Sequence, residues 1–182
     1  SEIIMIYYTS DDLTIRDMKK EDAEFFYNTY LSYGWHPSID TYLGYYKEQE
    51  ENKRKVFIAV YEENVAGICT LVLNPVEGPF GNRGIPEIVD FGVFFDKQNR
   101  GFGTKILDVV EEEAAKVNSL VYLAVGIHSG YGAAQRMYVK RGYIPDGTGA
   151  WYQGEQLDQY AKCNNDDDLV IFLSKDLTEL QL

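Results

Sequence analysis

The stretch FGVFFDKQNRGFGTKILDVVEEEAAKV, residues 91–117, constrains the fold of this chain more than any other part. It begins with apolar and aromatic residues, passes through a basic turn that holds two glycines, and continues with helical periodicity. One face of this helix carries Phe102, Ile106, Val109, Val110, Glu113 and Val117, of which all but Glu113 are apolar. A strand followed by a short glycine turn and an amphipathic helix predicts a layered α/β structure.

The rest of the chain supplies further strands and helices. Alternating or continuously apolar runs predict strands at 13–18, 87–95, 120–127 and 168–177, and a hairpin within 55–74. Helical spacing predicts helices within 19–34, 36–53 and 130–143. Three prolines and three glycines make 75–86 a loop, and 145–168 reads as one strand plus a mobile loop. This order predicts a mixed α/β sheet with helices on its faces.

Composition narrows the classes of function. The chain has 182 residues, 45% of them hydrophobic and 25% charged, which is typical of a single globular domain spanning 1–182. Its net charge of −12 argues against a nucleic-acid partner, and no apolar run is long enough to span a membrane. Cys69 and Cys163 form no metal-binding spacing, so we expect no metal and a reducing, cytoplasmic location.

The glycine turn itself has two readings. The first N–H groups of a helix have no intrahelical partner, and the helix dipole adds positive charge there, so this end attracts anions. Gly101 and Gly103 permit close approach to the backbone, and Arg100 adds a full charge. The alternative is a tight turn with a solvated arginine. The P-loop pattern G-x-x-x-x-G-K-[ST] does not occur, and G-x-G-x-x-G fails because position 106 is Ile.

Two motifs resemble those of the GNAT superfamily of N-acetyltransferases. Its acyl-CoA signature, [QR]-x-x-G-x-[GA] after the fourth strand, matches Gln98, Gly101 and Gly103, with Val93 as the last apolar strand residue. Its A-x-x-[LM]-Y-x-[KR]-x-G-[FY] pattern is similar to AQRMYVKRGY, residues 134–143. The resemblance implies a GNAT-like α/β (α+β) fold, in which helices flank a mixed, mostly antiparallel central sheet of six to seven strands.

The resemblance also implies acetyl-CoA as co-substrate. Backbone groups around Phe91 and Val93 would bind the pantetheine arm, and an N–H near Val93 or Phe94 would polarise the thioester carbonyl. Gly92 would fit a bulge in this strand. The CoA pyrophosphate would be held by Gln98, Asn99, Arg100, Gly101, Phe102, Gly103 and Thr104.

Acyl transfer to an amine needs a base for the ammonium and an acid for the leaving thiolate. Tyr138 stands at the position of the family's proton donor, although a half-buried aromatic on a helix face is the alternative. Glu87 resembles the base of the histone-type members and is our first choice. Asp90 is the second, and strand alternation predicts that the two carboxylates point to opposite faces.

The chain departs from the family pattern at two positions. Tyr131 stands where many members carry an asparagine, and Gly126 stands where some carry a glutamate base. His128 could replace that base or contact the acceptor, or be a surface residue. Trp35 and His36 lie where the family's acceptor site usually forms, although packing is the simpler role for Trp35.

These observations predict an N-acetyltransferase that moves acetyl from acetyl-CoA to a primary amine by direct attack in a ternary complex. The acceptor is a small molecule or a peptide, and the acidic net charge favours a cationic one. The alternatives are a catalytically inactive, CoA-binding regulatory domain and a nucleotide-binding module. A homodimer formed through the C-terminal strand stays open, as does the role of 153–168.

Overall fold

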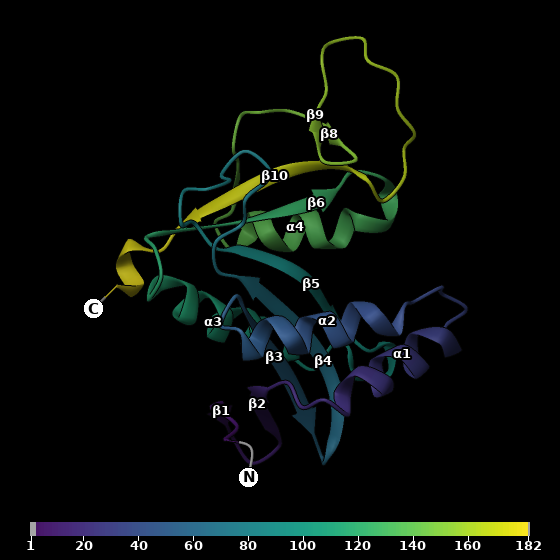
Figure 1. The fold of residues 1–182 in the computed structure, drawn as a ribbon, viewed down its shortest axis with the longest axis vertical. Helices are drawn as coiled ribbons and strands as arrows, with labels where there is room; N and C mark the ends of the chain where they lie inside the picture. The colour runs from purple at the N-terminus through teal and green to yellow at the C-terminus, as the bar shows by residue number, and fades with distance from the viewer. Residues whose placement is uncertain (1–2, 182) are drawn as a thin grey trace. The chain divides into compact units, whose positions relative to one another are not determined.

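The computed structural model describes residues 3–181. They form two compact units, of which the first holds residues 3–72 and 90–111, and the second holds 73–89 and 112–181. Strand β5 (Glu87–Val93) and helix α3 (Phe102–Ala115) contribute residues to both units, so each unit is described by itself (Figure 1). The single domain expected for 1–182 stays a prediction.

The first unit is an antiparallel meander with two helices. Its further elements are β1 (Ile6–Thr9), β2 (Leu13–Asp17), α1 (Asp22–Ser32), α2 (Ile39–Glu50), β3 (Arg54–Tyr61), β4 (Asn64–Val72) and a short 3-10 turn, Phe95–Lys97. The strands follow the order β1-β2-β3-β4-β5, and β1 to β4 are antiparallel. The expected hairpin is confirmed at β3–β4.

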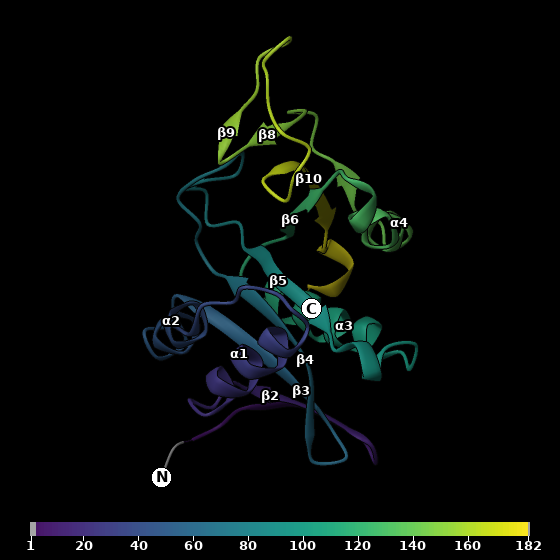
Figure 2. The same cartoon turned by 90° about the vertical axis from the view of Figure 1, so that its right-hand side faces the viewer.

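Opposite faces of these strands bind different helices. Val56, Ile58 and Ile68 pack against the apolar residues of α1 and α2, among them Phe26 and Tyr42. Gly67, the neighbour of Ile68, faces the other way, since a Cβ placed there would lie 3.3 Å from the Ile106 side chain of α3. Figure 2 shows α1 and α2 together on one side of β3 and β4, away from α3.

The second unit is built on two long antiparallel strands. They are β6 (Leu120–Gly126) and β10 (Leu169–Asp176), paired from Leu120 with Asp176 to Gly126 with Val170. The other elements are α4 (Gly132–Lys140), β7 (Ile144–Pro145), β8 (Trp151–Tyr152), β9 (Glu155–Gln156) and two 3-10 turns, Ser129–Tyr131 and Thr178–Leu180. The start of β5 runs parallel to β6, with Glu87 beside Tyr122.

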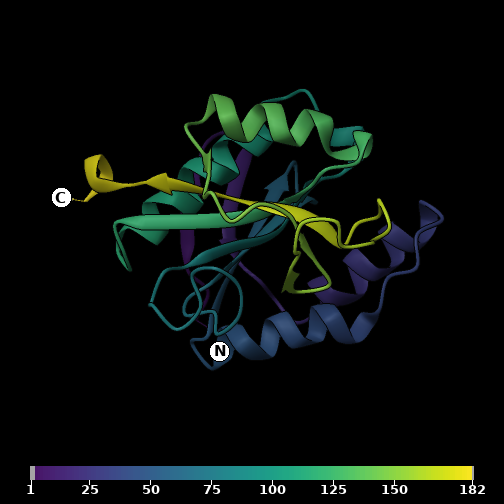
Figure 3. The same cartoon turned by 90° about the horizontal axis from the view of Figure 1, so that it is seen from above.

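Two different elements cover the β6–β10 pair. The loop 73–86 brings Phe80 and Ile85 onto Tyr122 and Phe172 of one face, with Trp151 at the margin. Figure 3 shows α4 on the opposite side of the two strands from this loop. The loop that the prolines and glycines predict therefore exists, and it completes a small core.

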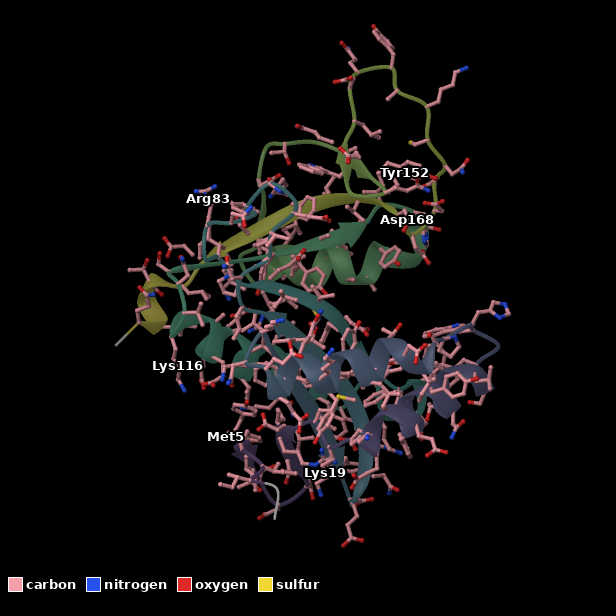
Figure 4. The ribbon with its side chains drawn as sticks, viewed as in Figure 1. Met5, Lys19, Arg83, Lys116, Tyr152 and Asp168 are labelled. Carbon is pink, nitrogen blue, oxygen red and sulfur yellow. The ribbon has the colours of Figure 1, made fainter. Side chains whose placement is uncertain are left out.

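The segment between β8 and β10 extends outward as a loop. Its ends meet, because Tyr152 pairs with Leu169 and the Gln153 amide donates to the Asp168 carbonyl at 3.3 Å. Figure 4 shows Tyr152 and Asp168 side by side at this base. The side chain at the tip is open to solvent, as Tyr160 is 92% exposed. The segment read as one strand and a loop thus contains the hairpin β8–β9 before the loop.

The expected number of strands needs correction. The described residues contain ten strands and not six or seven, because β1 and the two-residue strands β7, β8 and β9 add to the expected set. Strands of two residues have no periodicity that a sequence could reveal. The strand β10 is paired on both edges, with β6 along one and β7 and β8 along part of the other, and the homodimer stays a prediction.

Candidate functional site

The turn between β5 and α3 contains two left-handed residues. Asn99 has φ of 62° and Gly101 has φ of 81°, with Arg100 between them. Asparagine and glycine are the residues that adopt this conformation most readily. Such turns are typical of backbone concavities that bind anions, and here the turn leads directly into the fourteen-residue helix α3.

The two motif glycines have different roles. A Cβ at Gly101 would meet no atom within 4 Å, so its positive φ is what requires glycine, and the space above its backbone is open. A Cβ at Gly103 would lie 3.1 Å from the Phe91 ring, so this glycine lets α3 approach β5. Gln98 closes the turn by donating from Nε2 to the Val93 carbonyl at 3.1 Å.

The charge at the turn is positive. Arg100 lies over the Tyr61 ring, 5.2 Å from its centroid, and its Nη1 is 3.4 Å from the Tyr61 hydroxyl. Within residues 3–181 no carboxylate forms an ion pair with Arg100, whereas Lys97 is paired with Asp96 at 2.9 Å. An exposed arginine without an ion-pair partner beside a helix N-terminus fits a phosphate group.

Phe94 is part of the core and not of an oxyanion site. Its side chain is 3% exposed and packs against Phe26, with ring centroids 5.3 Å apart. Its amide donates to the Ala66 carbonyl at 2.9 Å. The hydrogen bond uses the N–H that was expected to face a thioester, so Val93 is the member of the pair that stays a candidate.

Asp90 lies where β5 departs from regular geometry. Its φ is 57°, so the left-handed residue of this strand is Asp90 and not Gly92, at which a bulge was expected. The side chain is exposed, and Tyr45 of α2 donates its hydroxyl to Oδ2 at 3.1 Å. The pKa of Asp90 is raised because surrounding protein atoms displace water, although the Tyr45 hydrogen bond and the Arg54 charge act to lower it.

Glu87 lies in the second unit beside a buried tyrosine. Tyr122, its register partner in β6, is fully buried, and its hydroxyl has no hydrogen-bond partner among the described residues. Burial raises the pKa of Tyr122, and the negative charge of Glu87 raises it further. Glu87 is half-buried.

Tyr138, the expected proton donor, lies in the last turn of α4. It is 7% exposed, and its ring lies edge-on to Tyr143 with the centroids 5.8 Å apart. Its carbonyl accepts the Tyr143 amide at 3.0 Å, which fixes the turn that ends the helix. Tyr138 is therefore held firmly by its surroundings, and its catalytic role stays a prediction.

His128 is tied to the long loop of the second unit. Its Nδ1 accepts the Gly130 amide at 3.0 Å, so Nε2 carries the proton of the neutral ring and donates to Asp167 at 2.7 Å. Hydrogen bonds from His128 and Tyr131 lower the pKa of Asp167. With both ring nitrogens engaged, the observed role of His128 is to anchor the loop.

Tyr131 explains one departure from the family pattern. A Cβ at Gly126 would lie 2.4 Å from two carbons of the Tyr131 ring, so the ring occupies the space that a side chain at 126 would need. The absence of a glutamate at position 126 and the presence of tyrosine at position 131 therefore belong to the same packing arrangement. The sequence shows both residues, but their contact depends on the 3-10 turn at Ser129–Tyr131.

Trp35 and His36 follow α1 in the first unit. The Trp35 ring stacks on Tyr30, with the centroids 5.0 Å apart and the planes at 18°, yet 49% of its surface is exposed. His36 is exposed. Packing is thus the observed contact of Trp35, and substrate binding by either residue stays a prediction.

A surface depression and two cysteines are further features of the described residues, which include neither a cluster of metal ligands nor a helix that could cross a membrane. A depression of about 650 Å³ between α1 and α2 is lined by Lys20, Glu21, Ala23, Glu24, Tyr27, Asn28, Ile39 and Leu43, and includes none of the expected site residues. No three His, Cys, Asp or Glu side chains gather in residues 3–181 as metal ligands would. None of the helices described is both long and apolar enough to cross a membrane. Cys69 and Cys163 are free thiols.

Comparison of the sequence with protein families identifies the family of this chain. The model of the acetyltransferase (GNAT) family matches residues 15–143, which is more than half of the chain. The matched region includes both the turn at Gln98–Thr104 and Tyr138. No curated protein sequence matches significantly.

Solved structures share the fold at low sequence identity. The apo form of RimL, described as a ribosomal L7/L12 alpha-N-protein acetyltransferase, has a TM-score of 0.71 at 12% identity, covering 96% of both chains. YncA from Salmonella typhimurium, a putative acetyltransferase with acetyl-CoA, has a TM-score of 0.67 at 18% identity, covering 93% of this chain and 96% of its own. A spermidine N-acetyltransferase SpeG chimera from Vibrio cholerae and hSSAT has a TM-score of 0.65 at 16% identity, covering 93% and 98%.

Proposed function

Because the chain belongs to the acetyltransferase (GNAT) family, we propose that it transfers acetyl from acetyl-CoA to a primary amine by direct attack in a ternary complex. The observation that carries the proposal is the turn before α3, where left-handed Asn99 and Gly101 flank an arginine without an ion-pair partner. A pyrophosphate there would accept hydrogen bonds from the first amides of α3 and lie near Arg100. We further propose a cytoplasmic enzyme.

The reaction assigns a role to each candidate residue. Val93 would bind the pantetheine arm through its backbone and direct its N–H at the thioester oxygen. Glu87 or Asp90 would take a proton from the ammonium, so that the amine can attack the carbonyl carbon. Tyr138 would give its proton to the departing CoA thiolate. Comparing Glu87→Gln with Asp90→Asn tells which carboxylate is the base. Only the variant that lacks the base is expected to lose the acidic limb of the pH–rate profile.

Direct attack is supported by the state of Cys69. This thiol is 0% exposed in β4, and burial raises its pKa well above the ordinary value, with the charge of Asp90 adding to the effect. A thiol that is protonated and inaccessible is a poor nucleophile. Ping-pong kinetics, or a protein acetylated on cysteine during turnover, would contradict the ternary complex.

The first experiment measures binding by calorimetry with CoA and with ADP. Arg100→Ala is expected to weaken CoA binding about tenfold, as loss of a charged hydrogen bond to phosphate would. Lys47→Ala, which removes an exposed lysine of α2, is the matched control. We prefer Arg100 to Gly103 for this test, because valine at Gly103 would also disturb the packing on Phe91. Equal affinity for ADP and acetyl-CoA would favour a nucleotide-binding module.

The second experiment measures acetyl-CoA turnover over a panel of amines and peptides, with mass spectrometry of the product. Tyr138→Phe is expected to lower kcat about a hundredfold without changing the Kd for CoA. A wild-type protein that binds CoA and acetylates no amine would favour the inactive regulatory domain.

A further inference from the structure

One carboxylate of the first unit stands among aromatic hydroxyl groups. Asp90 receives the hydroxyl hydrogen bond of Tyr45, and its charge also reaches Tyr30 and Tyr42. Burial raises the pKa of Tyr42 to about 12, with the charge of Asp90 adding to the effect. Tyr45 is the tyrosine that bonds to the carboxylate. The Tyr30 hydroxyl lies beside Gly92 of the same strand, 3.5 Å from where a Cβ would stand, and Tyr42 lies edge-on to Tyr45 with the ring centroids 5.9 Å apart.

The strained backbone of Asp90 supports a function at this position. A left-handed aspartate within a strand costs free energy that a glycine would not, and such residues gather at sites where geometry serves binding or catalysis. The conformation also breaks the alternation of side chains along β5. The carboxylate remains exposed to solvent beside the Tyr45 hydroxyl.

The positive charge nearest to this carboxylate, that of Arg54, is already bound to other groups. Arg54 of β3 stacks on the Tyr45 ring at 4.5 Å, but its Nε donates to Glu48 at 2.7 Å and its Nη1 donates to Thr70 at 2.8 Å. In the described part of the chain, no lysine, arginine or histidine forms an ion pair with Asp90. The remaining titratable neighbour is the buried thiol of Cys69. The position therefore carries an accessible negative charge with no ion-pair partner.

Aromatic rings complete the surroundings. Tyr30 lies 6.2 Å from Tyr42 between ring centroids, and its other stacked neighbour is the half-exposed Trp35. These rings stack on one another, so the group near Asp90 that can meet an ammonium is the Tyr45 hydroxyl, whose oxygen accepts hydrogen bonds. A carboxylate with a phenol oxygen beside it suits an alkylammonium ion and repels a second carboxylate.

We propose that Asp90, with the Tyr45 hydroxyl that bonds to it, binds the cationic nitrogen of the amine acceptor, and that this acceptor is a primary alkylammonium without a neighbouring carboxylate. The assignment rests on the proposed acetyl transfer. The ammonium donates to the Asp90 carboxylate and to the Tyr45 hydroxyl oxygen. Amino acids with a free carboxylate bind poorly, since their negative charge approaches that of Asp90.

The test compares 1,4-diaminobutane with 4-aminobutanoate, which differ in the charge of the far end. Calorimetry on the full chain with CoA present gives a Kd for each, and the diamine is expected to bind at least tenfold tighter. Asp90→Asn, which keeps the shape and tolerates the left-handed backbone, is expected to weaken diamine binding at least tenfold. Tyr45→Phe is expected to weaken it two- to fivefold. Asp40→Asn, an exposed aspartate in the first turn of α2, serves as the control.

The outcomes separate this inference from the proposed function. Unchanged diamine affinity in Asp90→Asn, with CoA binding and amine turnover intact, would overturn the assignment of Asp90 and leave the acetyltransferase standing. Loss of diamine affinity in a protein that acetylates no amine would keep the cation site and remove the proposed reaction. Equal binding of the diamine and the amino acid in the wild type would overturn the assigned substrate class. Circular dichroism establishes that each variant is folded.

Discussion

At the scale of single residues, the candidate site depends on contacts between residues whose types alone do not indicate them. The tyrosines of NTYLSYGWHPSIDTYLGYY suggest a lined pocket or amphipathic helices, and the structure shows that they make different contacts. Tyr42 is buried in the core, whereas Tyr45 bonds to Asp90. The sequence does not reveal this division, because it depends on how α2 is rotated against β5. Asp90 could be predicted as a candidate base, but not its left-handed conformation.

The pairing of Gly126 with Tyr131 leads to a residue-scale prediction. Gly126→Ala is expected to lower the free energy of unfolding by about 1–3 kcal/mol, because the new methyl group overlaps the Tyr131 ring. Urea denaturation measures the change. In a Tyr131→Ala background the same substitution is expected to cost far less, since the space is then empty. Equal costs in the two backgrounds would show that the ring is not the obstacle.

At the scale of elements, predictability follows length and periodicity. The helix α3 was predicted from five apolar positions and one glutamate, and the structure buries all of them except Val117, which lies beyond the helix end at Ala115. The β8–β9 hairpin was missed, although its turn, Gln153–Gly154, has the left-handed φ values of 53° and 81° that two-residue hairpins need. Two residues per strand are too few for an alternation to be recognised.

The β3–β4 turn gives the first element-scale prediction. Glu62 and Glu63 both have positive φ, 48° and 69°, in a two-residue turn that Asn-Gly fits best. Replacing the pair with Glu62→Asn and Glu63→Gly is expected to raise the free energy of unfolding by about 1 kcal/mol, because the strained backbone is relieved. Chemical denaturation measures it. Glu63→Ala removes a charge but keeps the Cβ; an equal gain there would attribute the effect to charge repulsion.

The hydrogen bond that anchors the long loop gives the second element-scale prediction. Without the His128–Asp167 hydrogen bond, the loop should open more often, so His128→Ala and Asp167→Ala are expected to speed tryptic cleavage after Lys162 roughly two- to tenfold. Asp158→Ala, on the same loop and without a side-chain hydrogen bond in the described structure, is the control. An equal increase in Asp158→Ala would mean that any substitution loosens the loop.

The same anchor has a defined pH dependence. The pKa of Asp167 is lowered in the folded protein by His128 first and Tyr131 second, so the stabilisation is present above the ordinary carboxyl pKa and is lost as pH falls through the lowered value. Amide hydrogen exchange in the loop, corrected for intrinsic rates, is expected to rise over that acidic range in the wild type. It should stay flat in Asp167→Asn, which has no charge to lose.

At the scale of the whole molecule, the family pattern of the sequence predicts more than its composition does. The net charge of −12 favours cationic partners in general, yet the inferred cation site uses only one carboxylate, Asp90, and its effect depends on the neighbours that surround it. Composition cannot supply that arrangement. The motif at Gln98–Thr104 predicts local structure better than composition does, because glycine and asparagine favour a left-handed backbone at their own positions.

The single domain expected from chain length also yields a prediction. Each compact unit holds one of the two tryptophans, Trp35 in the first and Trp151 in the second. Trp151→Phe and Trp35→Phe therefore give proteins whose fluorescence reports one unit at a time. Because β5 and α3 contribute residues to both units, neither unit can unfold without disrupting an element of the other.

We expect the two fluorescence transitions in urea to coincide with each other and with the loss of helical circular dichroism, as one cooperative unit requires. The midpoints are compared after each variant's overall stability is measured by circular dichroism, so that a shift caused by the substitution itself is removed. Midpoints that still differ would divide the chain into two folding domains. The turn at Gln98–Thr104 and Tyr138 would then belong to separate folding domains.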